Sequence, residues 1–259
     1  MLDRLKKQIR IWERDGKYSW ITQAATFAWV QARNLYDRIH IGQLRGVLKR
    51  NAFPTEPSVA VQMVCEGRIG RGARPMQVRQ ELDALIRLID ERKPRKLIEI
   101  GTARGGTLLL LCRFAAPDAQ IVSIDLPYAR NGGGYPRWKG KFYQSFTHPD
   151  QKLTLLRANS HDPETFRIVR DILGGDMADF LLIDADHSFE GVRTDFHTYI
   201  PLVAAGGLIA LHDILPNTED PSINVSEFWA QLEADSTHQT DTIVHDAAQG
   251  HSGIGLVYV

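Results

Sequence analysis

The sequence predicts an α/β fold in which helices cover both faces of a mostly parallel, doubly wound β-sheet. Two observations support this prediction. From about residue 76, short apolar runs that indicate buried strands alternate with segments in which apolar residues recur at helical spacing. The last two runs are separated by a connection too short for a parallel crossover, so we expect them to form an antiparallel hairpin.

The expected elements follow one another along the chain. The first helix has apolar residues at Leu82, Leu85 and Ile89, and Pro94 stops it. A later helix is expected to begin at Asp162, whose side chain caps it, with proline as the next residue. Strands are expected at residues 96–100, 120–125, 153–157, 180–184, 208–213, 242–246 and 253–259. Helices are expected at residues 78–92, 105–115, 162–173, 188–200 and 222–232.

Residues 1–75 are predicted to be an N-terminal helical extension and linker, and residues 76–259 the main domain. Apolar and basic positions alternate in the extension, which holds the aromatic residues Trp12, Trp20, Phe27, Trp29 and Tyr36. Its apolar face is expected to pack on the main domain or on a second copy of the chain, which favours a homo-oligomer. Attachment to a membrane surface is the alternative. Prolines and glycines between residues 54 and 72 predict an irregular linker.

Composition and charge narrow the range of partners. Lys plus Arg number 31, as do Asp plus Glu, so no charge excess points to nucleic acid or to an anionic membrane. No uncharged apolar stretch reaches the roughly 18 residues of a membrane span, and the charged N-terminus lacks the pattern of a signal peptide. The two cysteines, Cys65 and Cys112, offer no disulfide framework. These features indicate a cytoplasmic protein that acts on a small molecule.

The loop after the first strand is the first candidate ligand site, because ligands of such sheets bind at the carboxyl ends of the strands. It reads Gly101-Thr102-Ala103-Arg104-Gly105-Gly106, and its small residues let the backbone turn tightly ahead of a helix N-terminus. The glycine spacing also satisfies the loose dinucleotide pattern, which leaves an NAD-dependent oxidoreductase as an alternative. Glu99 favours S-adenosylmethionine (SAM), because its carboxylate disfavours a pyrophosphate and tolerates a cationic amino acid group.

Two further strand ends carry polar residues suited to the same ligand. Asp125 ends the second strand, where it can accept hydrogen bonds from both ribose hydroxyls of NAD or SAM. Ser160 follows the third strand, where a polar side chain can contact the adenine edge. A carboxylate in a solvated turn is the alternative role of Asp125, and helix capping is the alternative role of the segment that holds Ser160. The expected cofactor-binding set consists of Glu99, Gly101, Thr102, Gly105, Asp125, Ser160 and Asp184.

The fourth and fifth strands end in acidic and imidazole side chains. Asp184 and His187 follow the fourth strand, and His212 and Asp213 follow the core of the fifth. If these ends are neighbours, Asp184, His212 and Asp213 offer a donor set for a divalent cation such as Mg²⁺, which would lower the pKa of an acceptor hydroxyl. His187 is expected to remove the hydroxyl proton as general base, with Asp184 also acting in catalysis. Helix capping and ordinary hydrogen bonding are the alternatives.

A long connection runs between Pro127 and His148. It holds three consecutive glycines and the aromatic residues Tyr135, Trp138 and Tyr143. A long loop beside a binding crevice often acts as a lid or binding loop. Its aromatic faces and basic residues would suit a polar, ring-shaped acceptor. A disordered or oligomer-facing loop is the alternative.

Four segments, in this order and at this spacing, resemble the class I SAM-dependent methyltransferases over roughly residues 76–259: LIEIGTARGG, IVSIDLP, FLLIDADHSFEGV and LVAAGGLIALHDI. Two stretches, IDADHSFEGVRTDF and AGGLIALHDI, resemble the group that contains cephalosporin hydroxylase-like proteins and macrolide sugar O-methyltransferases. The combination of segments is specific, although each segment alone is not.

The resemblance implies a Rossmann-like, seven-stranded sheet with an antiparallel last strand, and SAM bound on the Gly101 loop with Asp125 on its ribose. It also implies O-methylation of a hydroxyl on a sugar, a glycoside or another polar small molecule, with Mg²⁺ on the three expected ligands and His187 as base. The family commonly has Glu or Asp where His212 stands, so a second base is the other role open to His212. Transfer to nitrogen or carbon, and a non-catalytic SAM-binding protein, are the competing functions.

Overall fold

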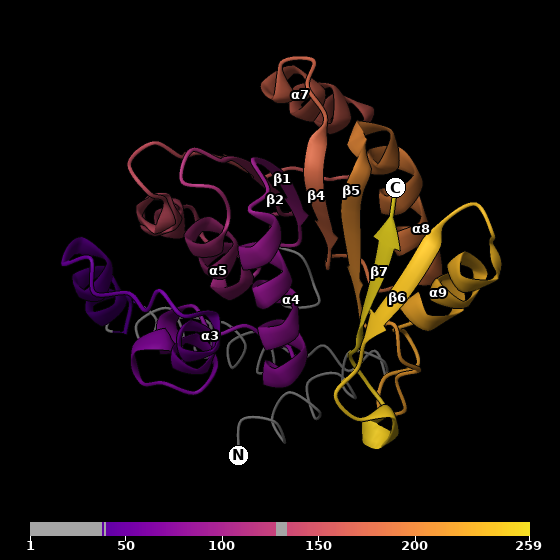
Figure 1. Ribbon diagram of the computed structural model, residues 1–259, viewed down its shortest axis with the longest axis horizontal. Helices are drawn as coiled ribbons and strands as arrows, with labels where there is room; N and C mark the ends of the chain where they lie inside the picture. The colour runs from indigo at the N-terminus through magenta and orange to yellow at the C-terminus, as the bar shows by residue number, and fades with distance from the viewer. Residues whose placement is uncertain (1–37, 39, 128–133) are drawn as a thin grey trace, which may run out of the picture.

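The computed structural model describes residue 38, residues 40–127 and residues 134–259 (Figure 1). This part of the chain contains a seven-stranded sheet in the order β3-β2-β1-β4-β5-β7-β6. Strands β1 to β5 pair in parallel, and β7 pairs antiparallel with both β5 and β6. The strands are β1 (Lys96–Ile100), β2 (Gln120–Ile124), β3 (Lys152–Leu156), β4 (Ala178–Ile183), β5 (Val203–His212), β6 (Gln239–Ile243) and β7 (Ile254–Tyr258).

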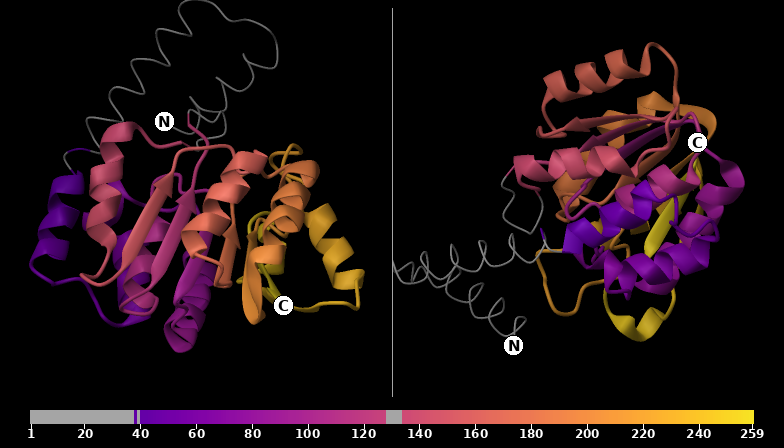
Figure 2. Two further views of the ribbon diagram at one scale, coloured as in Figure 1. Left: turned by 90° about the horizontal axis from the view of Figure 1, so that it is seen from above. Right: turned by 90° about the vertical axis from the view of Figure 1, so that its left-hand side faces the viewer.

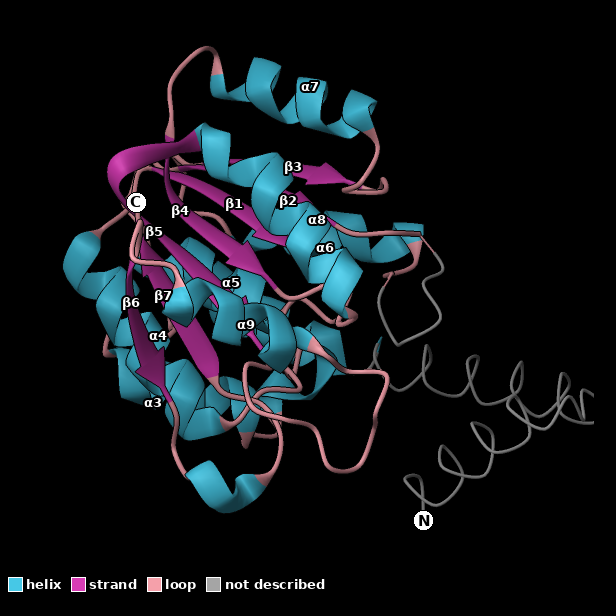
Figure 3. Cartoon of the chain, turned by 90° about the vertical axis from the view of Figure 1, so that its right-hand side faces the viewer, coloured by secondary structure: helices cyan, strands magenta, loops and turns pink. Residues whose placement is uncertain are grey.

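Helices cover both faces of the sheet (Figures 2 and 3). Successive residues of β5 belong to different layers: Leu208 and Ala210 pack in the cluster that includes α3, α4 and α5, whereas Ile209 and Leu211 pack with α7, α8 and α9. The longer helices are α3 (Pro57–Cys65), α4 (Arg79–Arg92), α5 (Gly106–Phe114), α7 (Pro163–Leu173), α8 (Phe189–Tyr199) and α9 (Val225–Ala234). The short ones are η1 (Ile69–Gly72), η2 (Arg137–Lys139), α6 (Gly140–Tyr143), η3 (Gln144–Phe146), η4 (Ile200–Leu202) and η5 (Ala247–Gln249). The predicted fold class, including the antiparallel strand near the end of the chain, is confirmed.

Strand β6 is the element whose position was predicted least well. We expected it at residues 242–246, but it spans Gln239–Ile243. Its register is set by pairing with β7, which places Gln239 opposite Tyr258 and Ile243 opposite Ile254. Because β6 is an edge strand with mostly exposed, polar side chains, its hydrophobic pattern gave little information about where it begins.

The segment predicted as an irregular linker contains helix α3. Pro57 occupies the first turn of this helix, where a missing N–H costs nothing, and the Glu56 carboxylate accepts hydrogen bonds from the Ser58 and Val59 N–H groups. The buried α3 side chains, Ala60, Val61 and Val64, belong to the same hydrophobic cluster as α4 and α5. The prolines therefore mark the start of a helix that packs on the main core.

The five aromatic residues of the predicted N-terminal extension, Trp12, Trp20, Phe27, Trp29 and Tyr36, lie outside the described residues. The division at residue 75 therefore remains a prediction. Among the helices of the described ranges, none is both long and apolar enough to cross a membrane.

Candidate active site

The carboxyl ends of the central strands lie side by side. Backbone hydrogen bonds extend the sheet by one residue beyond the strands: Gly101 N–H donates to the Ile124 carbonyl (2.9 Å), and Asp184 N–H donates to the Ile100 carbonyl (2.8 Å). Ile183 and Leu211 are paired in the sheet, which places the Asp184 segment beside His212. The predicted site residues that follow β1, β2, β4 and β5 are therefore brought to one edge of the sheet.

The loop after β1 depends on glycine at two positions. Gly101 has φ +104°, and a Cβ there would lie 2.0 Å from the Asp184 carbonyl oxygen. Gly105 has φ +82°, and a Cβ there would lie 2.6 Å from a ring carbon of Tyr143. Only glycine tolerates both this backbone conformation and these close approaches. The loop ends where α5 begins, at Gly106.

A buried polar chain lies below this loop. Glu99 is fully buried, and its Oε2 accepts a hydrogen bond from Ser123 Oγ (2.5 Å), which lies 2.5 Å from Thr102 Oγ1. Glu99 Oε1 is buried and has no hydrogen-bond partner among the described residues. Burial raises the pKa of Glu99 to about 8; the Ser123 hydrogen bond opposes this, and the negative charges of Asp125 and Asp184 add to it. An unpaired buried acceptor of this kind suits a cationic ligand group.

Asp125 joins the loop to the segment that begins at Gly134. Its Oδ2 accepts the Ala103 N–H (2.9 Å) and its Oδ1 accepts the Gly134 N–H (3.0 Å). Burial raises the pKa of Asp125 to about 6, against the effect of these backbone donors. Ser160 is also buried, and its carbonyl accepts the hydroxyl proton of Tyr199 (3.0 Å). Both predicted contacts of the adenosyl group thus lie at strand ends, Asp125 directly beside the Gly101 loop.

Four side chains meet at the ends of β4 and β5. His187 Nδ1 lies 2.6 Å from Asp213 Oδ2, and His187 Nε2 lies 4.0 Å from Asp184 Oδ1. His212 Nδ1 lies 3.1 Å from Asp184 Oδ1 and 3.3 Å from Asp213 Oδ1. The sequence predicted this convergence, since it requires only that β4 and β5 be neighbours.

The charges of this cluster stabilise one another. For His187 and His212, burial acts to lower the pKa, but the nearby carboxylates of Asp184 and Asp213 outweigh it and raise both values, that of His212 well above its ordinary range. Burial acts to raise the pKa of Asp213, but attraction to His212 and the hydrogen bond from His187 hold it well below its usual range. The two carboxylates therefore favour the protonated form of both imidazoles.

The predicted Mg²⁺ ligands Asp184, His212 and Asp213 do come together, but as arranged they do not fit a cation. Instead, His212 Nδ1 lies within ion-pair distance of both carboxylates. Within the described ranges, no group of three or more His, Cys, Asp or Glu side chains is arranged to hold a metal ion.

Gln77 is a site residue that the sequence did not reveal. Its Nε2 donates to Asp184 Oδ2 (2.8 Å), across 107 residues of sequence. Gln77 lies just before α4, where it belongs to no motif. Ser123 was also missed, although one signal was present: a hydroxyl residue in a strand that is otherwise apolar from Ile121 to Ile124.

The aromatic residues of the long connection are mostly structural. Tyr135, Tyr143 and Phe146 are buried and pack against one another, with the Tyr135 and Tyr143 rings 4.8 Å apart. The Tyr143 hydroxyl donates to the Ala103 carbonyl (3.1 Å) and so supports the cofactor loop from below. The expectation that the Tyr135 and Tyr143 ring faces receive the acceptor is therefore wrong, because buried neighbours already cover them. The three glycines expected in a lid lie partly outside the described residues.

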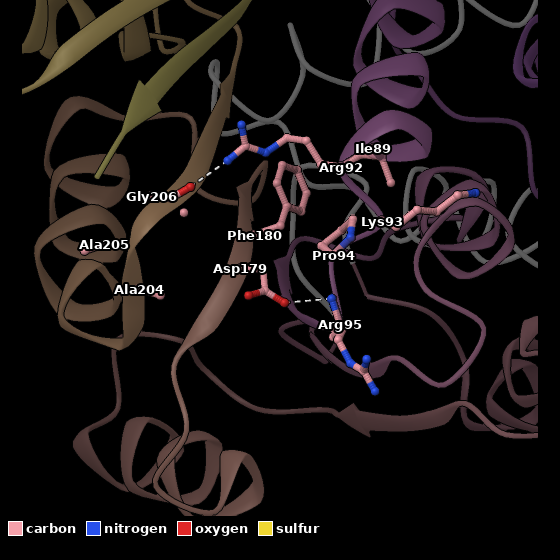
Figure 4. Close-up of a pocket in the computed structure, with 11 residues that line it drawn as sticks. Ile89, Arg92, Lys93, Pro94, Arg95, Asp179, Phe180, Ala204, Ala205 and Gly206 are labelled. Carbon is pink, nitrogen blue, oxygen red and sulfur yellow. Dashed lines mark hydrogen bonds between the residues drawn. The ribbon is translucent and has the colours of Figure 1, made fainter.

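A hollow at the opposite end of the strands, their amino ends, is separate from this cluster (Figure 4). It lies at the amino ends of β1, β4 and β5, where Arg92 donates to the Gly206 carbonyl (2.6 Å) and the Arg95 N–H donates to the Asp179 carboxylate (2.7 Å). These polar groups are paired within the protein, and the chemistry-bearing residues lie at the carboxyl ends of the strands. The hollow therefore contributes nothing to the candidate site.

Comparison with known proteins identifies what this region is similar to. Residues 98–214 match the family model described as a methyltransferase domain. This range contains the Gly101 loop, Asp125, Ser160 and the whole four-residue cluster. A curated relative, the protein y4gI of Sinorhizobium fredii, is 22% identical over 149 residues, which cover 57% of this chain. The chain spans only 16% of the length of that relative.

Solved structures support the same fold. The O-methyltransferase TomG from Streptomyces achromogenes, in complex with SAM, is 17% identical with a TM-score of 0.53, covering 79% of this chain and 89% of that one. Cofactor-bound Rv0187 from MTB is 19% identical with a TM-score of 0.54, covering 78% and 87%. An O-methyltransferase from Bacillus cereus, in complex with SAH, is 14% identical with a TM-score of 0.51, covering 85% and 91%. At these identities the likeness establishes the fold.

Proposed function

We propose that the protein is a class I, SAM-dependent methyltransferase that transfers the methyl group of SAM to a hydroxyl oxygen of a small-molecule acceptor, since residues 98–214 match a methyltransferase-domain model and the fold is that of a solved O-methyltransferase. One observation supports this most strongly: the Gly101 loop, Asp125 and the His187–Asp213 pair lie at one edge of the sheet. Cofactor contacts and a candidate general base thus face the same region.

The first half of the site has features suited to SAM. Glu99 lies beneath the loop with one oxygen unpaired within the described part of the chain, and a cationic ligand group would stabilise its ionised form. The two Asp125 oxygens accept the Ala103 and Gly134 N–H groups, which ribose hydroxyls can replace. The α5 N-terminus adds free backbone donors next to the loop. When bound, SAM supplies an electrophilic methyl group on its sulfonium sulfur.

The second half supplies deprotonation. The Nδ1 atom of His187 is held by Asp213, so Nε2 is the nitrogen available to take the acceptor hydroxyl proton. Asp213 fixes the ring orientation and stabilises the imidazolium that forms. Because the pKa of His187 is raised, the neutral base is populated only above the ordinary range of histidine. Methyl transfer is therefore expected to rise with pH through the raised pKa of His187.

The class of the acceptor and the use of a metal are more specific than the type of reaction. We propose a sugar, a glycoside or another polar small molecule as acceptor, an assignment that rests on the family resemblance. No step is assigned to a cation, because no group of three or more His, Cys, Asp or Glu side chains in the described ranges is arranged to hold one. Metal assistance by Asp184, His212 and Asp213 remains a prediction. The homo-oligomeric state and cytoplasmic location also remain predictions.

The experiment measures transfer of radiolabelled methyl groups from SAM to a panel of sugars, glycosides and catechols. His187→Gln is expected to reduce transfer by about 10²-fold or more while SAM still binds. The matched control is His197→Gln, an exposed histidine further along α8, which should transfer at the wild-type rate. Equal rates in His187→Gln and wild type would exclude His187 as base.

Two further arms of that assay separate the competing functions. Wild-type protein that binds SAM but methylates no acceptor of any class would favour a non-catalytic SAM-binding protein. Loss of transfer on addition of EDTA, with recovery on addition of Mg²⁺, would support the metal-assisted scheme in place of the metal-free one. Methylation of amines with unchanged rate in His187→Gln would support transfer to nitrogen.

A further inference from the structure

The segment that begins α4 contacts the acidic end of β4 directly and is linked to that of β5 through Gly253. Gln77, two residues before the helix, donates from Nε2 to Asp184 Oδ2 (2.8 Å). One turn later, Glu81 Oε2 accepts the Gly253 N–H (3.0 Å), and the Gly253 carbonyl accepts the Asp213 N–H (2.9 Å). In Figure 1 the first turn of α4 lies at the end of the sheet where β5 finishes.

Glu81 is a buried carboxylate held by three donors. Besides Gly253, it accepts hydrogen bonds at Oε1 from the His245 N–H (3.1 Å) and from Gln249 Nε2 (2.7 Å). Its side chain is fully buried. A fully satisfied buried polar network of this kind rigidifies the segments it joins, because losing one partner leaves a costly unpaired group. Glu81 therefore fixes the connection between β6 and β7 against α4.

The backbone that this connection supports is strained. Asp213 has φ 66° and Ser252 has φ 65°, values that favour glycine. Such conformations are unfavourable for residues other than glycine and persist only where the surrounding structure holds them. Here the Gly253 carbonyl accepts N–H groups of both Asp213 and Ile214, and the Ser252 carbonyl accepts the Leu215 N–H. The Glu81–Gly253 hydrogen bond is thus a direct support of the Asp213 conformation.

We propose that Gln77 and Glu81 are positioning residues of the methyl-transfer site. Gln77 orients Asp184. Glu81 orients Asp213 through the N–H and carbonyl groups of Gly253, and Asp213 in turn orients His187. The inference rests on the proposed function for the meaning of these carboxylates, although its structural part can be tested separately. Neither residue contacts the Gly101 loop or Asp125 in the hydrogen bonds described. Loss of either residue should therefore impair orientation at the ends of β4 and β5, and loss of Glu81, which contacts none of the expected SAM-binding residues, should leave SAM affinity unchanged.

The decisive variant for Glu81 is Glu81→Gln. Glutamine has the same shape, but its amide nitrogen replaces one acceptor where three donors converge, so at least one hydrogen bond is lost. The matched control is Glu91→Gln, an exposed position on the same helix with the same change of charge. The readout is the ¹⁵N chemical shift of His187 Nδ1, recorded at one fixed pH in the full-length protein through the ring C–H protons.

We expect the Nδ1 shift of His187 to move by several parts per million in Glu81→Gln and to stay in place in Glu91→Gln. A folded Glu81→Gln protein with an unchanged shift would overturn the role of Glu81. If Glu81→Gln does not fold, Glu81→Asp is measured in its place. It keeps the charge but is one methylene short of Gly253, and the same two outcomes apply.

Gln77 is tested by Gln77→Met, which keeps the length of the side chain and removes the donor. Its expected signature is a change in the ¹⁵N shift of His212 Nδ1, which lies 3.1 Å from Asp184 Oδ1. Gln62→Met, at an exposed position of α3, is the control. An unchanged His212 shift in Gln77→Met would overturn the role of Gln77.

Calorimetric titration of SAM into the same samples keeps the two proposals apart. If wild-type protein fails to bind SAM, the proposed function is wrong, but the ¹⁵N shifts still report whether Gln77 and Glu81 position the cluster. If SAM binds, Glu81→Gln should bind it as tightly as wild type. Up to about 100-fold lower kcat with unchanged SAM affinity is then expected, as for a misplaced catalytic group. Weaker SAM binding with unchanged kcat would overturn the positioning role.

Discussion

The two halves of the candidate site meet the cost of burying charge in opposite ways. Beneath the Gly101 loop, Glu99 is bonded by the neutral Ser123 hydroxyl and keeps one oxygen unpaired among the described residues. At the ends of β4 and β5, Asp184 and Asp213 each contact imidazole groups. The first half has a charge balance that a cationic ligand would complete. The second half is already balanced in the free protein.

This difference predicts how each half responds to ligand. The Glu99 half should gain most when SAM binds, because a sulfonium or ammonium group removes the penalty on its ionised form. The His187 half should be preorganised, because its geometry is fixed by partners that do not depend on ligand. Substitutions in the first half should therefore alter SAM binding and stability, and those in the second should alter the rate and its pH dependence.

The largest effect is expected for Asp213→Asn. Loss of this carboxylate removes the group that orients His187 and stabilises its imidazolium, so kcat should fall by about 10²–10⁴-fold. The pKa of His187 should also drop towards its ordinary value, which moves the rising limb of the pH–rate profile to lower pH. Steady-state kinetics across pH measure both effects. A profile that keeps its position would show that Asp213 does not set the protonation of His187. Asp241→Asn, on exposed β6, is the control.

Next in size is Gly101→Ala. The positive φ costs about 1–3 kcal/mol, and the added Cβ would lie 2.0 Å from the Asp184 carbonyl, so the strand ends must separate. Denaturant unfolding measures the loss of stability, and calorimetry the expected loss of SAM binding. The control is Gly174→Ala, which has φ +69° with open space around its Cβ. Equal destabilisation by the two variants would mean that close packing of the strand ends contributes nothing.

A smaller effect is expected for Asp125→Asn. One of the two ribose hydrogen bonds should be lost and the other should lose its charge, which is worth about 1.5–3 kcal/mol, or about 10- to 100-fold in SAM affinity. Calorimetric titration measures this affinity. If the kcat of the variant falls while its SAM affinity stays at the wild-type level, then the division of labour between the two halves is wrong.

The last prediction concerns stability rather than turnover: Glu99→Gln should change the stability in a pH-dependent way. Burial raises the pKa of Glu99 from 4.5 to about 8, so between these values the folded protein binds one more proton than the unfolded chain. Its free energy of unfolding therefore falls as pH rises through this window and levels off above it. Glutamine has no such proton, so the Tm gain of Glu99→Gln over wild type should grow from pH 5 to pH 9. A constant difference, as expected for Glu91→Gln, would contradict the raised pKa.

Much of this fold could be predicted because most helices and strands have recognisable patterns in their own residues. Buried strands such as β1 are mostly apolar, and Asp162 and Pro163 mark the start of α7 because one caps a helix and the other suits its first turn. Helix α3 was missed because its prolines resemble those of a linker. Strand β6 was misplaced because its limits depend on pairing with β7 rather than on its own residues.

The candidate site also combines features that the sequence predicts with features that only the structure shows. The meeting of Asp184, His187, His212 and Asp213 follows from strand order, which the alternation of strands and helices predicts. Whether these residues hold a metal or one another depends on side-chain geometry that no sequence pattern encodes. Gln77 and Glu81 act through contacts more than 100 residues away in sequence. Such contacts leave no local motif, so the supporting residues of the site emerged only from the structure.

The central claim is that the strand ends form one site in which the methyl donor faces His187. A crystal structure of the protein with the demethylated product of SAM tests it most directly. We predict the adenosyl group on the Gly101 loop, the ribose hydroxyls on Asp125, and the sulfur directed towards His187 Nε2. A ligand bound on another surface, or a sulfur directed away from the His187–Asp213 pair, would contradict the account.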